Sequence, residues 1–251
     1  MDKPFDTTRD AFLKGRIHVR QPVKGFRSGL DAVFLAAACP AQGGDAVLEA
    51  GCGAGVASLC LLARVENIVV RGIEADPALA AIARENALAN GFGESFEAVA
   101  GDVTAPWSSF GGLLRREAYD HVLANPPFYV HGRARLSKDG RNARSRAMDE
   151  GALNIWLRFL ASAAKPGGTA TIIHTAEAVP QLLSAFEGRF GGLRLIPLHP
   201  KAGASAIRVI LCGIKGSRAP FSLAPGIVLH EEDGTPTSTA RAVLRDGSGL
   251  F

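Results

Sequence analysis

Short apolar runs alternate with segments of helical hydrophobic periodicity between residues 45 and about 190. The apolar runs predict strands at 45–50, 68–74, 95–100, 119–124, 169–174, 193–198 and 206–214. The periodic segments predict helices near 31–38, 55–64, 77–89, 151–164 and 177–187. This alternation is typical of an α/β fold, in which helices cover both faces of a mostly parallel sheet. Only the polar stretch HPKAGAS joins the last two strands, so we expect an antiparallel hairpin at one end of the sheet.

The segment 77–89 has the clearest helix boundaries. Asp76 can cap its amino end, and Pro77 suits the first turn because its missing N–H needs no partner there. Asn90 and Gly91 can end the helix, since both residue types tolerate the left-handed backbone of a helix carboxyl cap.

Composition indicates a folded domain. The chain has 251 residues, of which 47% are hydrophobic and 21% charged, so it can bury a sizeable core. No apolar run reaches the roughly 18 residues of a membrane span, and the first ten residues do not look like a secretory signal. We expect one domain over 1–251 in the reducing cytoplasm, without a membrane. The four cysteines lack CxxC spacing, so we expect no metal site, and nothing indicates an oligomeric state.

The net charge of +4 is unevenly distributed. Residues 1–30 have seven basic and three acidic side chains, and residues 131–146 have six basic and one acidic. All other residues together have 15 basic and 20 acidic side chains. Two basic segments on a slightly acidic body indicate an anionic partner.

A glycine loop follows the first predicted strand. Gly51, Gly53 and Gly55 have G-x-G-x-G spacing, whereas the dinucleotide fingerprint needs a glycine where this chain has Val56. The loop therefore allows close backbone approach to a ligand, and a nucleoside with a small polar tail suits it better than a dinucleotide. Glycines in ordinary strand-to-helix turns give the same spacing.

Acidic residues near the ends of the predicted strands suggest what this ligand is. Glu74 can accept hydrogen bonds from both ribose hydroxyls. Asp102 can accept from an adenine amino group while the Val103 N–H meets a ring nitrogen, and Glu49 can face an ammonium group. Each acid alone is also compatible with a helix cap or a solvated side chain. Their common position favours S-adenosyl-L-methionine, which contains ribose, adenine and an amino-acid tail.

The tetrapeptide NPPF at 125–128 ends the fourth predicted strand. Its two prolines fix the backbone, so the Asn125 side-chain oxygen and the Pro126 carbonyl can point to one place. Two such acceptors can hold the N–H groups of a planar amine as its nitrogen attacks a methyl group. Phe128 can stack on the base that carries the amine. A rigid turn with a core phenylalanine is the alternative.

Taken together, EAGCGAG, the acid in GIEAD, AGDV and NPPF resemble class I S-adenosylmethionine-dependent methyltransferases that modify amino nitrogens. KGFRSGLDAVFLAA (24–37), IVLHEEDGTPTSTA (227–240) and the basic insert after NPPF resemble the bacterial tRNA1(Val) (adenine-N6)-methyltransferase family, so the resemblance extends over nearly the whole chain. It implies a Rossmann-like sheet of seven strands with the last strand antiparallel, and a target adenine in the anticodon loop. Phe128 departs from the tyrosine common in that family: stacking is kept and a hydroxyl contact is lost.

The basic insert 129–150 has little hydrophobic periodicity and predicts a flexible loop. It begins where the target base would lie, so its charges can contact RNA phosphates without reading sequence. These candidate RNA-binding residues are Arg133, Arg135, Lys138, Arg141, Arg144 and Arg146. A solvated surface loop is the alternative.

The N-terminal segment 1–40 comprises an entry segment and the first predicted helix. Its cationic side chains include Arg16, Arg20, Lys24 and Arg27. Ser28 and Asp31 have the spacing of a capping box before AVFLAA. The same two residues can also line the methionine end of the cofactor, and the two roles are compatible.

We therefore expect a methyltransferase that acts on an adenine N6 amine in RNA, with tRNA preferred. Asn125, Pro126 and Phe128 are its candidate catalytic residues, and Asn125 also borders the cofactor. Alternatives are methylation of a protein glutamine or of guanine N2 in rRNA, methylation of DNA adenine, and a non-catalytic RNA-binding protein that keeps the fold. The short segment before the first strand argues against the first two, because such relatives usually have an additional substrate domain.

Overall fold

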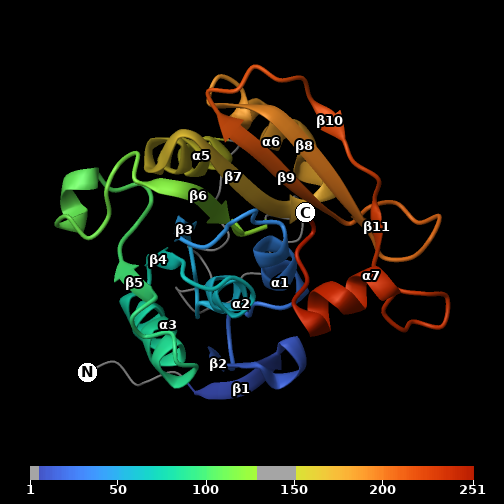
Figure 1. Ribbon diagram of the computed structural model, residues 1–251, viewed down its shortest axis with the longest axis horizontal. Helices are drawn as coiled ribbons and strands as arrows, with labels where there is room; N and C mark the ends of the chain where they lie inside the picture. The colour runs from blue at the N-terminus through green and yellow to red at the C-terminus, as the bar shows by residue number, and fades with distance from the viewer. Residues whose placement is uncertain (1–5, 129–150) are drawn as a thin grey trace.

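The computed structural model describes residues 6–128 and 151–251 (Figure 1). The strands of its main sheet are β3 (Ala46–Ala50), β4 (Val69–Glu74), β5 (Phe96–Ala100), β6 (Tyr119–Ala124), β7 (Ala164–Thr175), β8 (Phe190–His199), β9 (Arg208–Lys215), β10 (Ser222–Leu223) and β11 (Ile227–Val228). Its α-helices are α1 (Leu30–Ala37), α2 (Val56–Arg64), α3 (Pro77–Ala89), α5 (Ala152–Ala163), α6 (Val179–Phe186) and α7 (Ser238–Arg241). Short 3₁₀ or π turns are η1 (Leu13–Gly15), η2 (Trp107–Phe110), η3 (Ala176–Ala178) and η4 (Ala242–Asp246). Among the described residues, no helix is long and apolar enough to cross a membrane.

The sheet confirms the predicted α/β fold. All seven predicted strands form, and the strand order is β8-β9-β7-β6-β3-β4-β5. Pairings among β3 to β7 are parallel, whereas β9 runs antiparallel to both β7 and β8. The short strands β10 and β11, which the sequence did not predict, extend the β8 edge in parallel.

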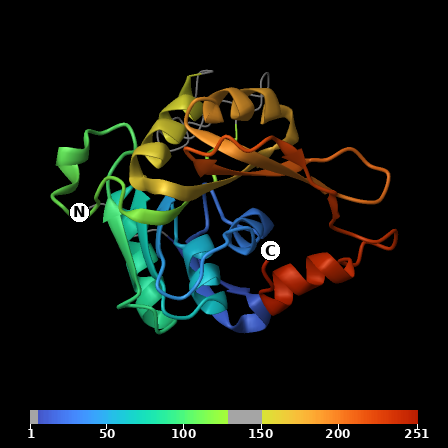
Figure 2. The same cartoon turned by 45° about the horizontal axis from the view of Figure 1, so that its top comes forward.

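Helices cover both faces of the sheet. Figures 1 and 2 show α1, α2 and α3 on one face and α5 and α6 on the other. Neighbouring strand residues point to opposite faces, so Val47 packs in the cluster under α1 to α3 and Leu48 in the cluster under α5 and α6. Burial on both faces explains why these strands are continuous apolar runs rather than alternating ones.

The ends of α3 lie where the sequence predicted them. Asp76 Oδ1 accepts a hydrogen bond from the Ala78 backbone N–H at 2.9 Å, and Pro77 is the first helical residue. Asn90 caps the carboxyl end, and Gly91 follows with a φ of +81°, a backbone angle that favours glycine.

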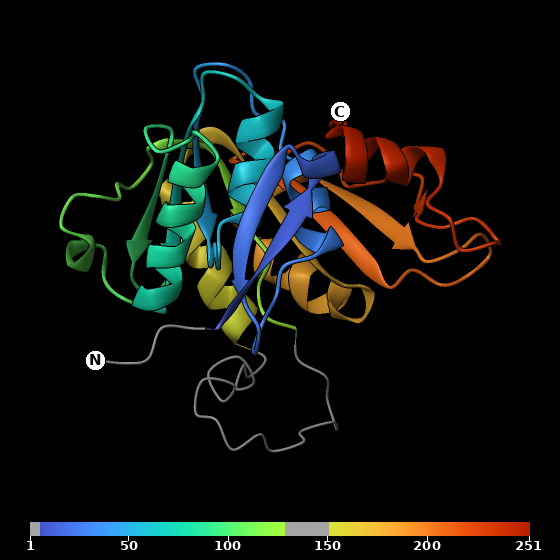
Figure 3. The same ribbon diagram turned by 90° about the horizontal axis from the view of Figure 1, so that it is seen from below.

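A two-stranded hairpin precedes the main sheet. It consists of β1 (Thr7–Phe12) and β2 (Ile17–Pro22), which pair antiparallel. The sequence did not predict it, because β1 is mostly exposed and lacks an apolar alternation. The hairpin lies across the side of the molecule that carries α2 and α3 (Figure 3).

Candidate active site

The predicted site residues meet at one edge of the sheet. In the parallel register, Ala50 at the end of β3 pairs with Ile73 in β4 and with Ala124 in β6, and Glu74 pairs with Ala100 in β5. The segments that follow these four strands therefore leave the sheet at the same edge. This edge is where ligands bind in open α/β sheets.

The glycine loop has the backbone that its residues predict. Gly51, Gly53 and Gly55 have φ angles of +67°, +56° and +87°. A Cβ atom on Gly51 would lie 2.6 Å from Cη2 of Trp156 in α5, so this glycine allows the indole to pack against the loop. A Cβ atom on Gly53 would meet no atom within 4 Å, so a ligand can approach the backbone there.

Glu74 ties the glycine loop to the start of α3. Its Oε2 accepts from the Gly53 N–H at 3.0 Å, and its Oε1 accepts from the Asp76 N–H at 2.9 Å. Burial raises the pKa of this carboxyl group, although the hydrogen bonds from the backbone oppose the rise. Glu74 thus lies beside the loop, and its contact with the ribose hydroxyls stays a prediction.

Glu49 lies beneath the loop at the start of α2. It is buried, and its Oε2 accepts from both the backbone N–H of Ser58, at 3.0 Å, and the Ser58 hydroxyl group. Burial raises the pKa of the Glu49 carboxyl group to about 7, and the hydrogen bonds from Ser58 oppose the rise. The partner of this acid in the structure is therefore the first turn of α2.

Asp102 and Val103 follow β5 at the same edge. Asp102 is exposed, and its Oδ1 accepts from the backbone N–H of Thr104 at 2.8 Å and from its hydroxyl group at 2.7 Å. This turn fixes the carboxylate beside the half-buried Val103. Asp102 therefore lies at the predicted edge of the sheet, and its contact with an adenine amino group stays a prediction.

The NPPF segment leaves β6 beside the loop. Asn125 Oδ1 is buried, and it has no hydrogen-bond partner among the described residues. Pro126 is buried, while Pro127 and Phe128 are half-buried. A buried acceptor without a donor is rare in folded proteins and favours a site that a ligand donor completes.

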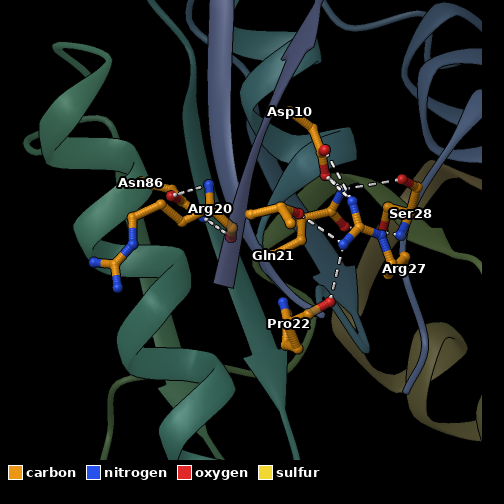
Figure 4. Close-up of polar contacts among 8 residues, drawn as sticks. Asp10, Arg20, Gln21, Pro22, Arg27, Ser28 and Asn86 are labelled. Carbon is orange, nitrogen blue, oxygen red and sulfur yellow. Dashed lines mark hydrogen bonds and ion pairs between the residues drawn. The ribbon is translucent and has the colours of Figure 1, made fainter. Parts of the chain in front are cut away.

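The segment between β2 and α1 is held by polar contacts with the hairpin (Figure 4). The buried Gln21 side chain accepts from the Ser28 N–H at 2.9 Å and donates to Asp10 at 2.8 Å. Arg27 donates to both carboxylate oxygens of Asp10 and to the Pro22 carbonyl. The hairpin thus fixes the backbone that leads to Ser28.

The capping box predicted for Ser28 and Asp31 is wrong. Helix α1 begins at Leu30 after Gly29, and no side chain caps its amino end. Asp31 Oδ2 instead accepts from Nε of Arg208 at 3.0 Å, in an ion pair between residues 177 positions apart. Asp31 Oδ1 is buried without a hydrogen-bond partner among the described residues, as Asn125 Oδ1 is.

Two residues that sequence analysis left without a role contact Phe128. The guanidinium carbon of Arg208, in β9, lies 4.7 Å from the Phe128 ring centroid. The ring of the buried His174, in β7, lies 4.8 Å from it at an interplanar angle of 73°. Burial lowers the pKa of His174 to about 4, and the Arg208 charge adds to this effect. No local motif reveals these residues, because the β7–β9 pairing brings them together.

The predicted RNA-binding residues in 129–150 lie outside the described residues. In the N-terminal segment, three of the four predicted cations have intramolecular partners. Arg20 pairs with Glu85, Arg27 pairs with Asp10, and Arg16 donates to the Ala63 and Asp246 carbonyls. The N-terminal charge therefore contributes to holding the hairpin in place.

All four cysteines are free thiols. Cys52, in the glycine loop, is buried, and burial raises its pKa well above the usual range, so it is a protonated thiol. Among residues 6–128 and 151–251, no group of three or more His, Cys, Asp or Glu side chains could hold a metal ion.

Comparison with known proteins gives consistent results. A family model described as the methyltransferase small domain matches residues 30–165. Two relatives named tRNA1(Val) (adenine(37)-N6)-methyltransferase are similar over most of their length. The one from Actinobacillus succinogenes is 28% identical over 210 residues, which cover 82% of this chain and 84% of the relative. The one from Shewanella loihica is 26% identical over 240 residues, which cover 96% and 93%.

Solved structures agree on the fold. A crystal structure of a predicted O-methyltransferase, Atu636 from Agrobacterium tumefaciens, has a TM-score of 0.74 and 26% identity and covers 88% of this chain and 98% of its own. Geranyl diphosphate methyltransferase in complex with S-adenosylmethionine has a TM-score of 0.53 and 14% identity and covers 73% of this chain and 84% of its own. The second similarity concerns the fold alone.

Proposed function

Because the chain belongs to the methyltransferase small domain family and uses S-adenosyl-L-methionine as its cofactor, we propose that it methylates the N6 amine of an adenine in tRNA. The observation that supports this most directly is the buried acceptor Asn125 Oδ1, which has no donor among the described residues. An exocyclic amine supplies two N–H donors, of which Asn125 can take one and the Pro126 carbonyl the other.

The chemistry of these two acceptors suits an amine. The nitrogen of an adenine amino group is a poor nucleophile because its lone pair is delocalised into the ring. As the nitrogen bonds to the methyl carbon, that carbon would leave the cofactor sulfur, and the nitrogen becomes pyramidal and positive until it releases one proton to solvent. Two fixed oxygen acceptors stabilise that charge. The proline pair fixes their backbone before the base arrives.

An oxygen acceptor fits this site less well. A hydroxyl group must lose its proton to a general base if its oxygen is to attack a methyl group efficiently. The Asn125 amide oxygen and a backbone carbonyl accept hydrogen bonds but do not take up protons at neutral pH. The geometry therefore favours nitrogen over oxygen as the methyl acceptor.

The residues at the sheet edge fit the parts of the cofactor, which supplies an activated methyl group. We propose that Glu74 holds the ribose hydroxyls and that Asp102 and the Val103 N–H hold the adenine. The approachable backbone at Gly53 leaves room for the nucleoside. Asp31 Oδ1 is a buried acceptor that an ammonium group can satisfy. Ser28, just before α1, and Glu49, at the end of β3, are further candidates for this end of the cofactor.

The choice of tRNA rests on the named relatives and on the basic insert. We propose that the six cations of segment 129–150 contact tRNA phosphates, because this segment directly follows Phe128. The whole chain 1–251 then acts as a single methyltransferase domain.

Mass spectrometry of tRNA nucleosides tests this function. A strain that lacks the gene should lose N6-methyladenosine from tRNA, and the purified chain with labelled cofactor should restore it. An Asn125→Ala chain is the control, because it should bind the cofactor without restoring the base. Unchanged tRNA in the deletion strain would contradict the proposal.

The same acceptor geometry serves two other planar NH₂ groups, the side-chain amide of a protein glutamine and the N2 amine of guanine in rRNA. If tRNA is unchanged in the deletion strain and a release factor loses methylglutamine, the substrate is a protein glutamine. If rRNA loses N2-methylguanosine, the guanine acceptor is correct.

A further inference from the structure

We propose that Arg208 is a positioning residue for methyl transfer, which supports the Phe128 ring so that its plane is set before the target base arrives. This inference rests on the proposed function, because it assumes that Phe128 stacks on the base. Three elements distant in the sequence supply the contacts: α1 supplies Asp31, β7 supplies His174, and β9 supplies Arg208.

The antiparallel strand β9 places Arg208 at the active edge. Strands β3 to β7 present their carboxyl ends there, and β9 presents its amino end because it runs in the opposite direction. Arg208 therefore pairs with Thr175, next to His174, at the end of β7. From this position its side chain reaches both Asp31 and Phe128.

Asp31 fixes the guanidinium group. Nε of Arg208 donates to Asp31 Oδ2 at 3.0 Å, and the side chains are 28% and 16% exposed, so solvent screens this pair less than a surface pair. Nη1 of Arg208 also donates to the backbone carbonyl of Ile207 at 3.1 Å. Two hydrogen bonds fix the orientation of the planar guanidinium group. A lysine ammonium group has no such plane.

The guanidinium group and a neutral imidazole both contact Phe128. The Arg208 contact, at 4.7 Å from the ring centroid, has the geometry of a cation–π interaction. His174 packs against the same ring at 4.8 Å and, being neutral at physiological pH, does not repel Arg208. The half-buried Phe128 ring is thus held by contacts from outside the NPPF segment.

A double-mutant cycle tests whether Arg208 acts through Phe128. The four chains are wild type, Arg208→Ala, Phe128→Leu and the double variant, each assayed for kcat and KM with tRNA from the deletion strain. We expect Arg208→Ala to lower kcat/KM about tenfold and Phe128→Leu at least as much, with little further loss in the double variant. Affinity for S-adenosylhomocysteine, measured by calorimetry, should fall by less than kcat/KM does in Arg208→Ala, because this variant keeps the Asp31 carboxylate. Losses that multiply in the double variant would overturn the proposal.

Two further variants separate the possible causes. Arg194→Ala is the matched control. Arg194 lies on the neighbouring strand β8, and its guanidinium carbon is also 4.7 Å from a phenylalanine ring centroid, that of Phe251. It should leave kcat/KM unchanged. Arg208→Lys keeps the charge but not the plane, so we expect it to resemble Arg208→Ala. Full activity in Arg208→Lys would overturn the proposal. A lower KM for tRNA in Arg208→Ala would also overturn it, because it would mean that the guanidinium group occupies the place of the base.

A measurement without RNA keeps this inference separate from the proposed function. In chains with ¹³C-labelled phenylalanine, the Phe128 ring signals are assigned through Phe128→Leu. The chemical shifts of these signals should change in Arg208→Ala and should not change in Arg194→Ala. If they move but the wild type methylates no tRNA, only the proposed function fails. If they do not move, the positioning role of Arg208 is wrong.

Discussion

Asn86 in α3 pairs with both backbone polar groups of Arg20 in β2. Its Oδ1 accepts from the Arg20 N–H at 2.8 Å, and its Nδ2 donates to the Arg20 carbonyl at 3.0 Å. Asn90 does the same for His18, at 2.9 Å and 2.7 Å. Asn86 and Asn90 are four helical residues apart, a rise of about 6 Å, and His18 and Arg20 are two strand residues apart, a rise of about 6.7 Å. The spacing of the two asparagines therefore matches the spacing of backbone polar groups along one edge of β2. The helix side chains thus take the place of a neighbouring strand.

Removing this contact should weaken the whole fold. Asn86→Ala leaves the N–H and carbonyl of Arg20 and the carbonyl of Ala54 without a partner, so we expect a loss of about 2–4 kcal/mol in the free energy of unfolding. Urea denaturation measures it. Glu85→Ala is the control, since it removes only an exposed ion pair with Arg20 and should cost less than about 1 kcal/mol. Equal losses in the two variants would contradict the role of Asn86.

Asn125→Ala should separate cofactor binding from methyl transfer. The variant removes one acceptor that stabilises positive charge in the transition state, so we expect kcat to fall by about 100-fold or more. Affinity for S-adenosylhomocysteine should stay within a few-fold. Asn125→Asp keeps an oxygen at the same place and should retain more activity than Asn125→Ala. Normal turnover in Asn125→Ala would contradict the proposed mechanism.

Glu74→Gln should weaken cofactor binding. Both carboxylate oxygens accept backbone N–H groups, from Gly53 and from Asp76, whereas an amide has one oxygen and turns its NH₂ group toward the other donor. We expect the affinity for S-adenosylhomocysteine to fall about 10- to 100-fold by calorimetry. Glu94→Gln, at an exposed position after α3, should leave it unchanged. An unaltered affinity in Glu74→Gln would exclude Glu74 from the cofactor site.

The buried Glu49 should make stability depend on pH. Its pKa is about 7 in the folded chain and near the usual 4.5 in the unfolded chain, so the folded state binds more protons between these values. The stability of the wild type relative to Glu49→Gln should therefore be greatest below pH 4.5, fall by roughly 3 kcal/mol up to pH 7, and stay level above it. Urea denaturation at several pH values measures this difference. Glu66→Gln, at an exposed position, should show no such slope.

The insert 129–150 should determine how salt affects tRNA binding. Replacing Arg133, Arg135 and Arg141 by alanine should reduce the slope of log affinity against log salt by about 2, since each phosphate contact contributes about 0.7. Replacing the same three by lysine should leave the slope nearly unchanged, because the charges remain. Filter-binding titrations at several salt concentrations compare the two triple variants. An unchanged slope in the alanine variant would place the contacts elsewhere.

Local signals predicted much of this structure. The seven main strands and five of the helices were predicted within a few residues, because apolar runs covered on both faces and the cap at Asp76 are encoded in neighbouring positions. NPPF and the glycine loop were likewise predicted at the ends of strands, and the structure places them at one edge.

Contacts between distant residues were not predicted. Asp31 looked like a cap for α1, but it pairs with Arg208, which is 177 residues away. The hairpin was not predicted because β1 lacks an apolar face, and because the contacts of β2 with Asn86 and Asn90 in α3 join residues far apart in the sequence. His174 and Arg208 gave no signal, since an apolar strand does not reveal which of its ends faces a site.

The reversed strand β9 has a consequence for how relatives can diverge. The family model ends at residue 165, whereas His174 and Arg208 lie beyond it. Most residues that we propose for methyl-donor binding and amine recognition therefore lie within 30–165, whereas Arg208, which we propose as support for the Phe128 ring, lies beyond it. If both proposals hold, directed evolution toward new acceptors should begin in this C-terminal region, with Arg208 kept because it pairs with Asp31.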